Sequence, residues 1–318
     1  ESFSSRIKKE GKGKRYDCIV GVSGGVDSSW ALIQAKELGL RPLAVHMDNG
    51  WDSELAQNNI ENLVKKLDID LYTYVINWDE YRELMQAFFD ADVLDVELLY
   101  DNAMLAVNYK QAYKYGLKYI LAGYNKTSEG MRMPPGWNWF KYDKKNIYSI
   151  ARKKGNKKIK TFPSFGTIDY VFYKYFKGID MCHFLDFFPY DKNKALKVLQ
   201  KEYNYKPYPY KHYESIFTRF YQGYILPQKF SVDKRKVHLS TLISANQMDR
   251  DEALKQIKNI PYPSKEKLNN DIDYFLKKMG WNRNDLEEYI SRPEKDHSYY
   301  GSEKSFFYFL SKIYNRIK

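Results

Sequence analysis

Apolar residues follow two different patterns along the first half of the chain. Short runs rich in apolar and β-branched residues predict strands, at 16–22, which reads as buried, and at 42–47, 71–76, 118–122 and 179–187. Segments in which apolar residues recur every three or four positions predict helices, at 29–38, 55–67, 79–90 and 97–115. Because strands that alternate with helices pair in parallel, the sequence predicts an α/β fold with a doubly wound parallel sheet.

After residue 190 the apolar spacing is helical only. The expected helices lie at 192–203, 213–225, 234–246, 249–258, 264–279, 283–290 and 302–316. Residues 131–165 carry few regular signals, which is typical of functional or mobile segments. We therefore expect a flexible basic lead-in at 1–15, an α/β domain at 16–190 and a helical C-terminal region at 191–318.

The charge balance favours an anionic ligand or partner. The 318 residues include 52 Lys and Arg against 40 Asp and Glu, which gives a net charge of +12. Such a surface attracts nucleotides, sugar phosphates, RNA or membranes. The excess is concentrated at 6–15 and 152–160, both expected to be solvated loops. Charge of this kind does not by itself establish nucleic-acid binding.

Two further counts exclude whole classes of protein. The chain has only two cysteines, Cys18 and Cys182, so neither a disulfide framework nor a zinc site built from Cys alone is expected. Hydrophobic residues make up 43% of the chain, enough for a folded core. No stretch approaches the roughly 20 apolar residues of a membrane helix. We therefore expect a cytoplasmic protein without membrane contact.

A small-residue loop follows the first predicted strand and opens the first predicted helix. It consists of Ser23, Gly24, Gly25, Val26, Asp27 and Ser28. The glycines let the backbone wrap closely around an anion, and the amide groups at a helix start favour negative charge. Asp27 would repel a bare phosphate, but it fits if Mg²⁺ lies between its carboxylate and the phosphates. The alternative is a tight turn capped by Asp27 or Ser28.

Polar residues also follow other predicted strands, at the sheet edge where ligands bind in open α/β folds. His46, Met47 and Asp48 end the second strand, and Gly123 ends the fourth. Beyond Gly123, Asn125 and Glu129 are candidates to face ATP phosphates or Mg²⁺. The alternative for this loop is a helix cap at Thr127 or Ser128, and Asp101, at another helix start, is equally well explained as a cap.

The loop Ser23–Ser28 resembles the pyrophosphate loop of the PP-loop ATP pyrophosphatase superfamily, and it has neither Walker nor G-x-G-x-x-G spacing. The resemblance implies an adenine nucleotide alpha hydrolase-like fold at 16–190 that splits ATP into AMP and pyrophosphate. It implies that the backbone of His46, Met47 and Asp48 reads the adenine. Within this site we expect Ser23, Asp27 and Asn125 to act in catalysis, with Mg²⁺ on Asp27.

Three segments narrow the choice within the superfamily. LYDNAM at 99–104, AGYNKTSEG at 122–130 and KHYESIFTRFYQ at 211–222 resemble the N-acetyl sugar amidotransferases. The resemblance covers most of residues 16–258. It implies that ammonia replaces an acetamido oxygen of a nucleotide-activated sugar, which gives the acetamidino sugars of bacterial surface glycans such as lipopolysaccharide O-antigen.

The third segment and the residues after it supply the expected sugar-binding groups of 191–318. With Asp101, these candidates are Lys211, His212, Glu214, Ser215, Thr218, Arg219, Lys234 and Arg235. Cations, hydroxyls and a carboxylate suit a sugar that carries phosphate or carboxylate groups. The alternative is an ordinary amphipathic helix, with Ile216, Phe217, Phe220 and Tyr221 in the core and the charges in solvent.

The cysteines indicate how ammonia is obtained. Cys18 lies inside the first predicted strand, and Cys182 lies in the fifth, so both are expected to be core residues and not nucleophiles. We therefore expect a separate glutaminase subunit, which the resemblance suggests is like that of imidazole glycerol phosphate synthase. The resemblance also implies cysteine pairs upstream of the loop that bind zinc, and because the printed sequence has none, a zinc role stays open.

Two other functions remain open. The basic charge supports a tRNA-modifying PP-loop enzyme, although many tRNA thiolases need a reactive cysteine pair and nucleic acid is not the expected partner. A non-catalytic module that only binds a nucleotide would show the same loop. Pyrophosphate release with a nucleotide sugar would exclude both.

Overall fold

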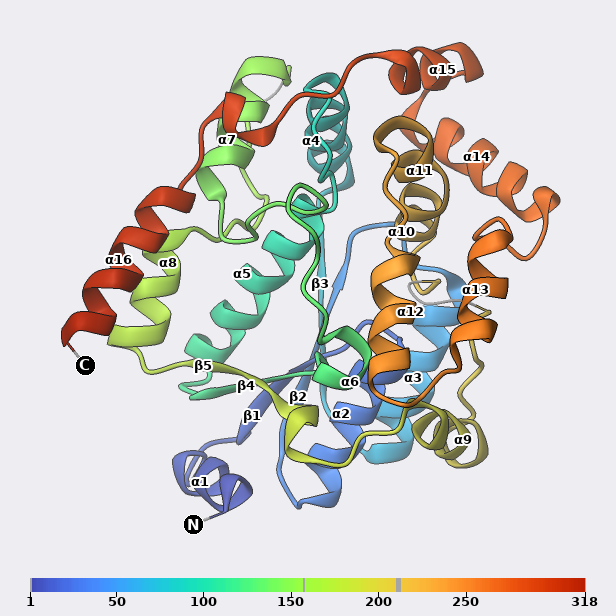
Figure 1. Ribbon diagram of the computed structural model, residues 1–318. Helices are drawn as coiled ribbons and strands as arrows, with labels where there is room; N and C mark the ends of the chain where they lie inside the picture. Colours follow the sequence, from blue (N-terminus) through green and yellow to red (C-terminus); the bar gives the residue numbers. More distant parts are fainter. Residues whose placement is uncertain (1, 157, 210–212, 318) are drawn as a thin grey trace.

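A computed structural model describes residues 2–156, 158–209 and 213–317, and Figure 1 shows the arrangement of its helices and strands. Five parallel strands form one sheet: β1 (Cys18–Gly21), β2 (Pro42–Asp48), β3 (Leu71–Val75), β4 (Tyr119–Ala122) and β5 (Asp180–His183). Their order is β3-β2-β1-β4-β5. The order reverses beside β1, and in such sheets this switch point is where ligands bind. The predicted fold class is confirmed.

Side chains alternate between the two faces of β1, because successive residues of a strand point in opposite directions. Cys18 and Val20 join a core cluster with α1, α2, α3 and α9, whereas Ile19 joins the cluster of α4 and α5 on the other face. The first group has bounds Phe3–Glu10, Val26–Glu37, Glu54–Leu67 and Lys192–Tyr203. The second has Trp78–Asp90 and Leu98–Lys114. Helices therefore cover both faces of the sheet.

The C-terminal region is helical, as predicted. Its helices are α10 (Ile216–Phe220), α11 (Leu226–Phe230), α12 (Arg235–Ser244), α13 (Arg250–Lys258), α14 (Lys265–Met279), α15 (Arg283–Ser291) and α16 (Lys304–Ile317). A π-helical turn, η3 (Tyr221–Ile225), joins α10 to α11 and carries the helix beyond its predicted end. Phe217 and Phe275 belong to the same core cluster as α4 and α5. The boundary at residue 190 remains a prediction.

Several segments differ from the expectation. The start is helical instead of an irregular lead-in, because Ile7 is fully buried in α1. The stretch 131–165 contains α7 (Lys144–Lys154), so part of the expected basic loop is the last turn of a helix. Further short elements not predicted are α6 (Lys126–Glu129), α8 (Thr167–Val171), η1 (Phe172–Phe176), η2 (Phe184–Phe187) and η4 (His297–Tyr300), and η2 replaces the second half of the strand expected at 179–187. All five are short, so they give little periodic signal.

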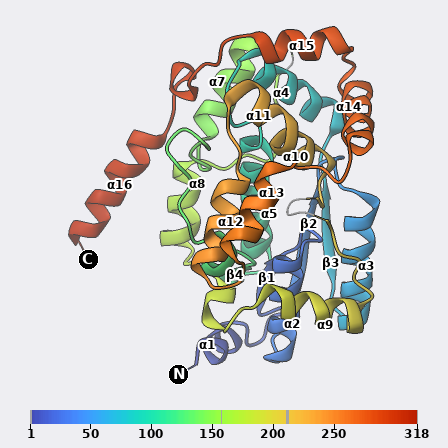
Figure 2. The ribbon, with the colours of Figure 1, turned by 45° about the vertical axis from the view of Figure 1, so that its right-hand side comes forward.

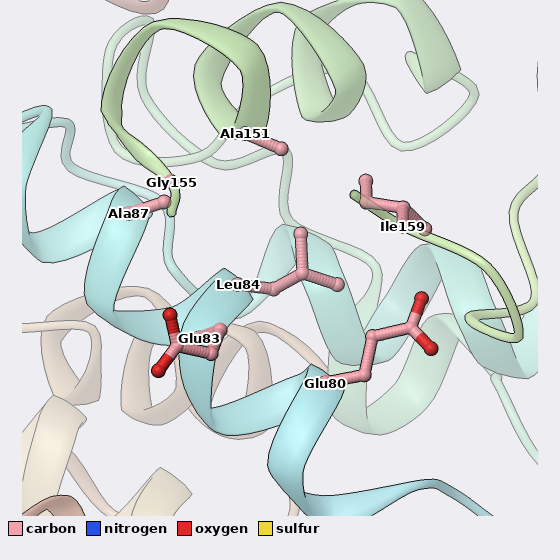
Figure 3. A pocket seen from close by; sticks show the side chains of 7 residues that line it. All are labelled: Glu80, Glu83, Leu84, Ala87, Ala151, Gly155 and Ile159. Atoms are coloured by element: carbon pink, nitrogen blue, oxygen red, sulfur yellow. The ribbon is translucent and has the colours of Figure 1, made fainter. Parts of the chain in front are cut away.

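Two cavities lie away from the carboxyl ends of β1, β2 and β4. The one in Figure 3, between α4 and α7, has a volume of only about 10 Å³, roughly one water. An open basin of about 470 Å³ lies near the amino ends of β1 and β2 and is lined by Lys8, Lys9, Lys12, Gly13, Asp17, Gly39 and Arg41. Within the described ranges, no helix combines the length and apolar character needed to span a bilayer.

A buried ion pair joins α10 to α14. Arg219 donates from Nε to Oδ2 of Asp271 at 2.5 Å and from Nη2 to Oδ1 at 2.6 Å. The side chains are only 8% and 3% exposed. Asp271 thus engages two of the three guanidinium nitrogens and gives Arg219 a structural role, while its expected part in sugar binding stays a prediction. The positive charge of Arg219 therefore contributes to the packing of α10 against α14.

Arg219→Ala is expected to destabilise the protein by about 3 kcal/mol, because it leaves the buried Asp271 carboxylate with only the Lys267 ammonium, 3.5 Å away, as a cation. Chemical denaturation would measure the change. Arg283→Ala is the matched control, since its pair with Asp273 is exposed and worth at most about 1 kcal/mol. Equal losses in the two variants would contradict the structural role of Arg219.

Candidate functional site

The loop Ser23–Ser28 leaves β1 and enters α2 as predicted, and its own hydroxyls close it into a ring. Ser23 Oγ lies 3.1 Å from Ser28 Oγ and accepts from the Gly25 amide at 3.3 Å. Ser28 Oγ donates to the Gly25 carbonyl at 3.2 Å. Gly25 is the N-cap of α2, with no side-chain cap. The capping alternative is therefore not observed, and the amides at the start of α2 suit an anion.

Three glycines of this region lie in close contact with neighbouring groups, and two of them, Gly24 and Gly123, are required by contacts with backbone under 3 Å. Gly24 has φ +81°, and a Cβ there would lie 2.8 Å from the Ala56 carbonyl oxygen. A Cβ on Gly123 would lie 2.7 Å from the Ser28 amide nitrogen. A Cβ on Gly25 would lie 3.3 Å from Glu214 Oε1. The end of β4 and the Glu214 carboxylate therefore both lie against the phosphate loop.

Asp27 lies in the first turn of α2 and accepts two hydrogen bonds. The Tyr190 hydroxyl donates to Oδ1, and Ser128 Oγ donates to Oδ2 at 3.4 Å. Among the residues that the structure describes, no cluster of three or more His, Cys, Asp and Glu side chains could hold a metal. A Mg²⁺ at Asp27 would thus need phosphate oxygens to complete its shell, which matches how Mg²⁺ binds with nucleotides.

His46 organises the end of β2. Its Nδ1 lies 2.9 Å from the Val22 carbonyl oxygen and its Nε2 lies 3.0 Å from Asp52 Oδ2. Burial acts to lower the pKa of His46, but the hydrogen bond and negative charge of Asp52 outweigh it and raise the pKa above its ordinary value. The His46 side chain thus fixes the end of β2 to the start of the phosphate loop.

The β2 backbone fits the expected adenine contact. The Val45 carbonyl accepts from Val22 on the β1 side, and the Asp48 carbonyl accepts from Ile76 on the β3 side. Since successive residues of a parallel strand bond to alternate neighbours, the Met47 backbone faces the β1 side. The β1 pairing ends at Gly21 opposite Val45. Met47 therefore lies just past the end of β1, over the start of the loop, while the Asp48 side chain turns back to accept from the Gly50 amide at 2.7 Å.

Residues 214–216 are paired with the chain that follows β2. The Ser53 amide donates to the Glu214 carbonyl at 2.9 Å, and the Ile216 amide donates to the Trp51 carbonyl at 2.8 Å. The bridge is antiparallel, with Asp52 opposite Ser215. It places two predicted sugar-binding residues, Glu214 and Ser215, beside the end of β2, and the Glu214 carboxylate lies against Gly25 of the phosphate loop.

Other expected sugar-binding residues have structural partners. Ser215 Oγ caps α10 by accepting from the Thr218 amide at 3.2 Å. Lys234 pairs with Glu97 at 2.8 Å. Lys211 and His212 lie outside the described residues.

Arg235 joins the start of α12 to the end of α13. Its guanidinium pairs with Asp233 at 2.8 Å and donates to the carbonyls of Gln256 and Asn259 at the end of α13. Arg235 therefore has a structural role, and its expected part in sugar binding stays a prediction. The sequence shows the cation but not the helix end that it serves.

The remaining predicted residues differ in location and in the contacts that they make. Asn125 is buried and caps α6 by accepting from the Ser128 amide at 2.8 Å, the role expected for a neighbour. Glu129 ends α6, and its carbonyl accepts from the Tyr124 hydroxyl. Asp101 is not a cap. It pairs with Lys141 at 2.8 Å and keeps 36% of its side-chain surface exposed.

Sequence reasoning missed three tyrosines that contact the loop. Tyr205 and Tyr208 both donate to the Gly24 carbonyl, at 3.0 and 3.1 Å, and Tyr190 bonds Asp27. They flank or follow α9, which lies beside α2 and α3 (Figure 2). With 30 tyrosines in the chain, composition does not distinguish these three.

Both cysteine thiols have raised pKa values, which makes them poor nucleophiles. Cys18 is fully buried, and burial raises the pKa of its thiol. Burial also raises the pKa of Cys182 to about 11. Both thiols are therefore protonated near neutral pH, which does not favour attack on glutamine.

Comparison with known proteins gives partial matches. Residues 214–314, less than half of the chain, match the model described as LPS biosynthesis protein WbpG-like, C-terminal domain. An uncharacterised protein of Methanocaldococcus jannaschii is 38% identical over 87 residues, which span 27% of this chain and 30% of that protein. The matched segment thus covers under a third of the relative's length.

Two solved structures are similar at low identity. One is an NH3-dependent NAD synthetase from Campylobacter jejuni, with a TM-score of 0.33 and 15% identity, covering 63% of this chain and 90% of that one. The other is an NMN synthetase from Francisella tularensis, with a TM-score of 0.32 and 15% identity, covering 66% and 97%.

Asp52→Asn is expected to lower the pKa of His46, because burial then acts with less opposition. NMR titration of the imidazole would measure it. In the unaltered protein the raised pKa stabilises the fold fully below the ordinary pKa of 6.5, and this contribution is lost as pH rises through the folded-state value. A His46 pKa that is unchanged or higher in the variant would contradict the assignment.

Proposed function

We propose that this protein is an ATP-dependent amidotransferase that converts an acetamido group of a nucleotide-activated sugar into an acetamidino group, for bacterial surface glycan synthesis. One observation carries the proposal: the segment that resembles the sugar amidotransferases lies against the phosphate loop. A Cβ on Gly25 would be 3.3 Å from Glu214 Oε1. Residues 214–314 also match the WbpG-like LPS biosynthesis domain.

The loop and the end of β2 supply the two halves of an ATP site. The amides at the start of α2, with Ser23 and Ser28, favour the pyrophosphate end, and the Met47 backbone lies where it can read adenine. When bound, Mg²⁺ would neutralise phosphate charge. Asp27 would hold it, and Glu214 is the next nearest carboxylate to the loop for which a contact is recorded.

The reaction activates a poor electrophile. The acetamido oxygen attacks the α-phosphorus of ATP, the bond to the β-phosphate oxygen breaks, and pyrophosphate leaves. Ammonia then adds to the imidate carbon, the bond to the adenylate oxygen breaks, and AMP leaves with the oxygen while the amidine keeps the nitrogen. The loop's role is to orient ATP and stabilise the charge on the departing pyrophosphate.

Ammonia is proposed to come from a separate glutaminase subunit. Burial keeps Cys18 and Cys182 protonated, so neither supplies the thiolate that glutamine hydrolysis needs. The unassisted protein should therefore use ammonium salts but not glutamine.

The direct test is mass spectrometry of reactions with ATP, Mg²⁺, ammonium and a panel of UDP- and CMP-linked diacetamido sugars. Exchange of oxygen for NH lowers the sugar mass by about one unit and is accompanied by one AMP for each amidine formed. Absence of AMP with every sugar would overturn the proposal. Salt-dependent tRNA binding with AMP release on tRNA would instead favour a tRNA-modifying enzyme.

Asp27→Ala is expected to abolish pyrophosphate release while thermal unfolding stays close to that of the unaltered protein, because Asp27 is only partly buried in the first turn of α2. Release of pyrophosphate would be measured by a coupled phosphate assay. Tyr190→Phe is the matched control, since it removes the hydrogen bond to Asp27 but keeps the carboxylate. Full activity of Asp27→Ala would exclude Asp27 from the mechanism.

A further inference from the structure

Two tyrosine hydroxyls converge on one carbonyl of the phosphate loop. Tyr205 donates to the Gly24 oxygen at 3.0 Å and Tyr208 donates to the same oxygen at 3.1 Å. Tyr205 is only 3% exposed. Burial raises the pKa of both phenols, so both remain hydrogen-bond donors at neutral pH.

The Tyr208 hydroxyl and the backbone between the two tyrosines are held in place from outside the loop. Asn59 of α3 donates from Nδ2 to the Tyr208 hydroxyl at 3.2 Å and to the Lys206 carbonyl at 3.0 Å. Its Oδ1 accepts from the Lys206 amide at 2.9 Å. The segment from 205 to 208 is thus fixed to α3, and the Gly24 carbonyl meets donors whose positions are set before any ligand binds.

Holding this carbonyl also sets the direction of the next amide. No cis peptide occurs within the described ranges, and in a trans peptide the C=O and N–H point in opposite directions. With the Gly24 oxygen turned toward the tyrosines, the Gly25 N–H points to the other side, where it donates to Ser23 Oγ at 3.3 Å. That side is the interior of the loop.

A peptide between two glycines reorients at low cost, because neither residue has a Cβ to restrict φ and ψ. The reversed Gly24–Gly25 peptide would place a carbonyl oxygen inside the loop, where it would repel a phosphate. Gly24 is itself required, since it has φ +81° and any Cβ would meet the Ala56 carbonyl. The sequence therefore cannot stiffen the loop by replacing Gly24, and another restraint is needed.

We propose that Tyr205 and Tyr208 are positioning residues that lock the Gly24–Gly25 peptide with its amide facing the pyrophosphate of ATP. This inference rests on the proposed function of the loop, since it assigns the two phenols a role in binding that same group. The restraint is present before the nucleotide arrives, so binding does not have to order the loop.

The test is the affinity of magnesium pyrophosphate for the double variant Tyr205→Phe/Tyr208→Phe, measured by isothermal titration calorimetry. Loss of both hydroxyls should weaken binding about tenfold, and each single variant should lose less. Tyr203→Phe, at the end of α9 just before this segment, is the matched control and should bind as the unaltered protein does. Unchanged affinity in the double variant and both single variants would overturn the proposal.

A second readout separates positioning from general stability. With ¹⁵N-glycine labelling, the Gly25 amide signal of the double variant should broaden or shift before ligand is added, while the fold is intact by circular dichroism. An unaltered Gly25 signal with weakened binding would also overturn the proposal. If the unaltered protein does not bind magnesium pyrophosphate, the proposed function of the loop fails, and the role of the tyrosines fails with it.

Discussion

The antiparallel pairing of residues 51–53 with 214–216 is the contact on which the candidate site depends. Two backbone hydrogen bonds, from Ser53 to Glu214 and from Ile216 to Trp51, join the start of the helical region to the carboxyl edge of the sheet. Without them, a segment more than 150 residues away along the chain would have no reason to lie beside the phosphate loop. The pairing uses main-chain groups, so it constrains position without consuming the side chains of Glu214 and Asp52.

The strands and helices that could be predicted are those whose apolar residues form a local pattern in the sequence. The strands and most of the long helices are predictable because their apolar residues form short runs or recur with a helical period, as with Ile19 against Cys18 and Val20, whereas α7 is not. The segments that were missed depend on single distant contacts. Ile7 makes α1 a packed helix, and the Arg41 guanidinium bonds to the carbonyls of Gly11 and Lys14 that follow it. The basic residues at the start of the chain give no local indication of these long-range hydrogen bonds.

The site was predictable where backbone geometry dictates residue type, and not where charge was the only signal. The loop glycines are required by φ and by contacts under 3 Å at Gly24 and Gly123, so their pattern is legible in the sequence. A basic residue, by contrast, looks the same in the sequence whether its side chain binds a ligand or a carboxylate of its own chain. Arg219 and Arg235 belong to the second kind, and their partners, Asp271 and the end of α13, follow them by more than 20 residues.

The net positive charge of the chain also does not describe the site itself. Among the described residues, burial raises the pKa of Asp52 and the nearby charges of Asp48 and Glu214 add to that effect, while Asp27 lies on the phosphate loop. Acidic side chains around the site repel a polyanion such as ATP. The favourable contributions to the free energy of ATP binding must therefore come from oriented amides and from a divalent cation that arrives with the nucleotide. Amide dipoles act only when they point at the ligand. In an acidic site of this kind, the orientation of one peptide therefore matters more than it would in a site lined with lysines.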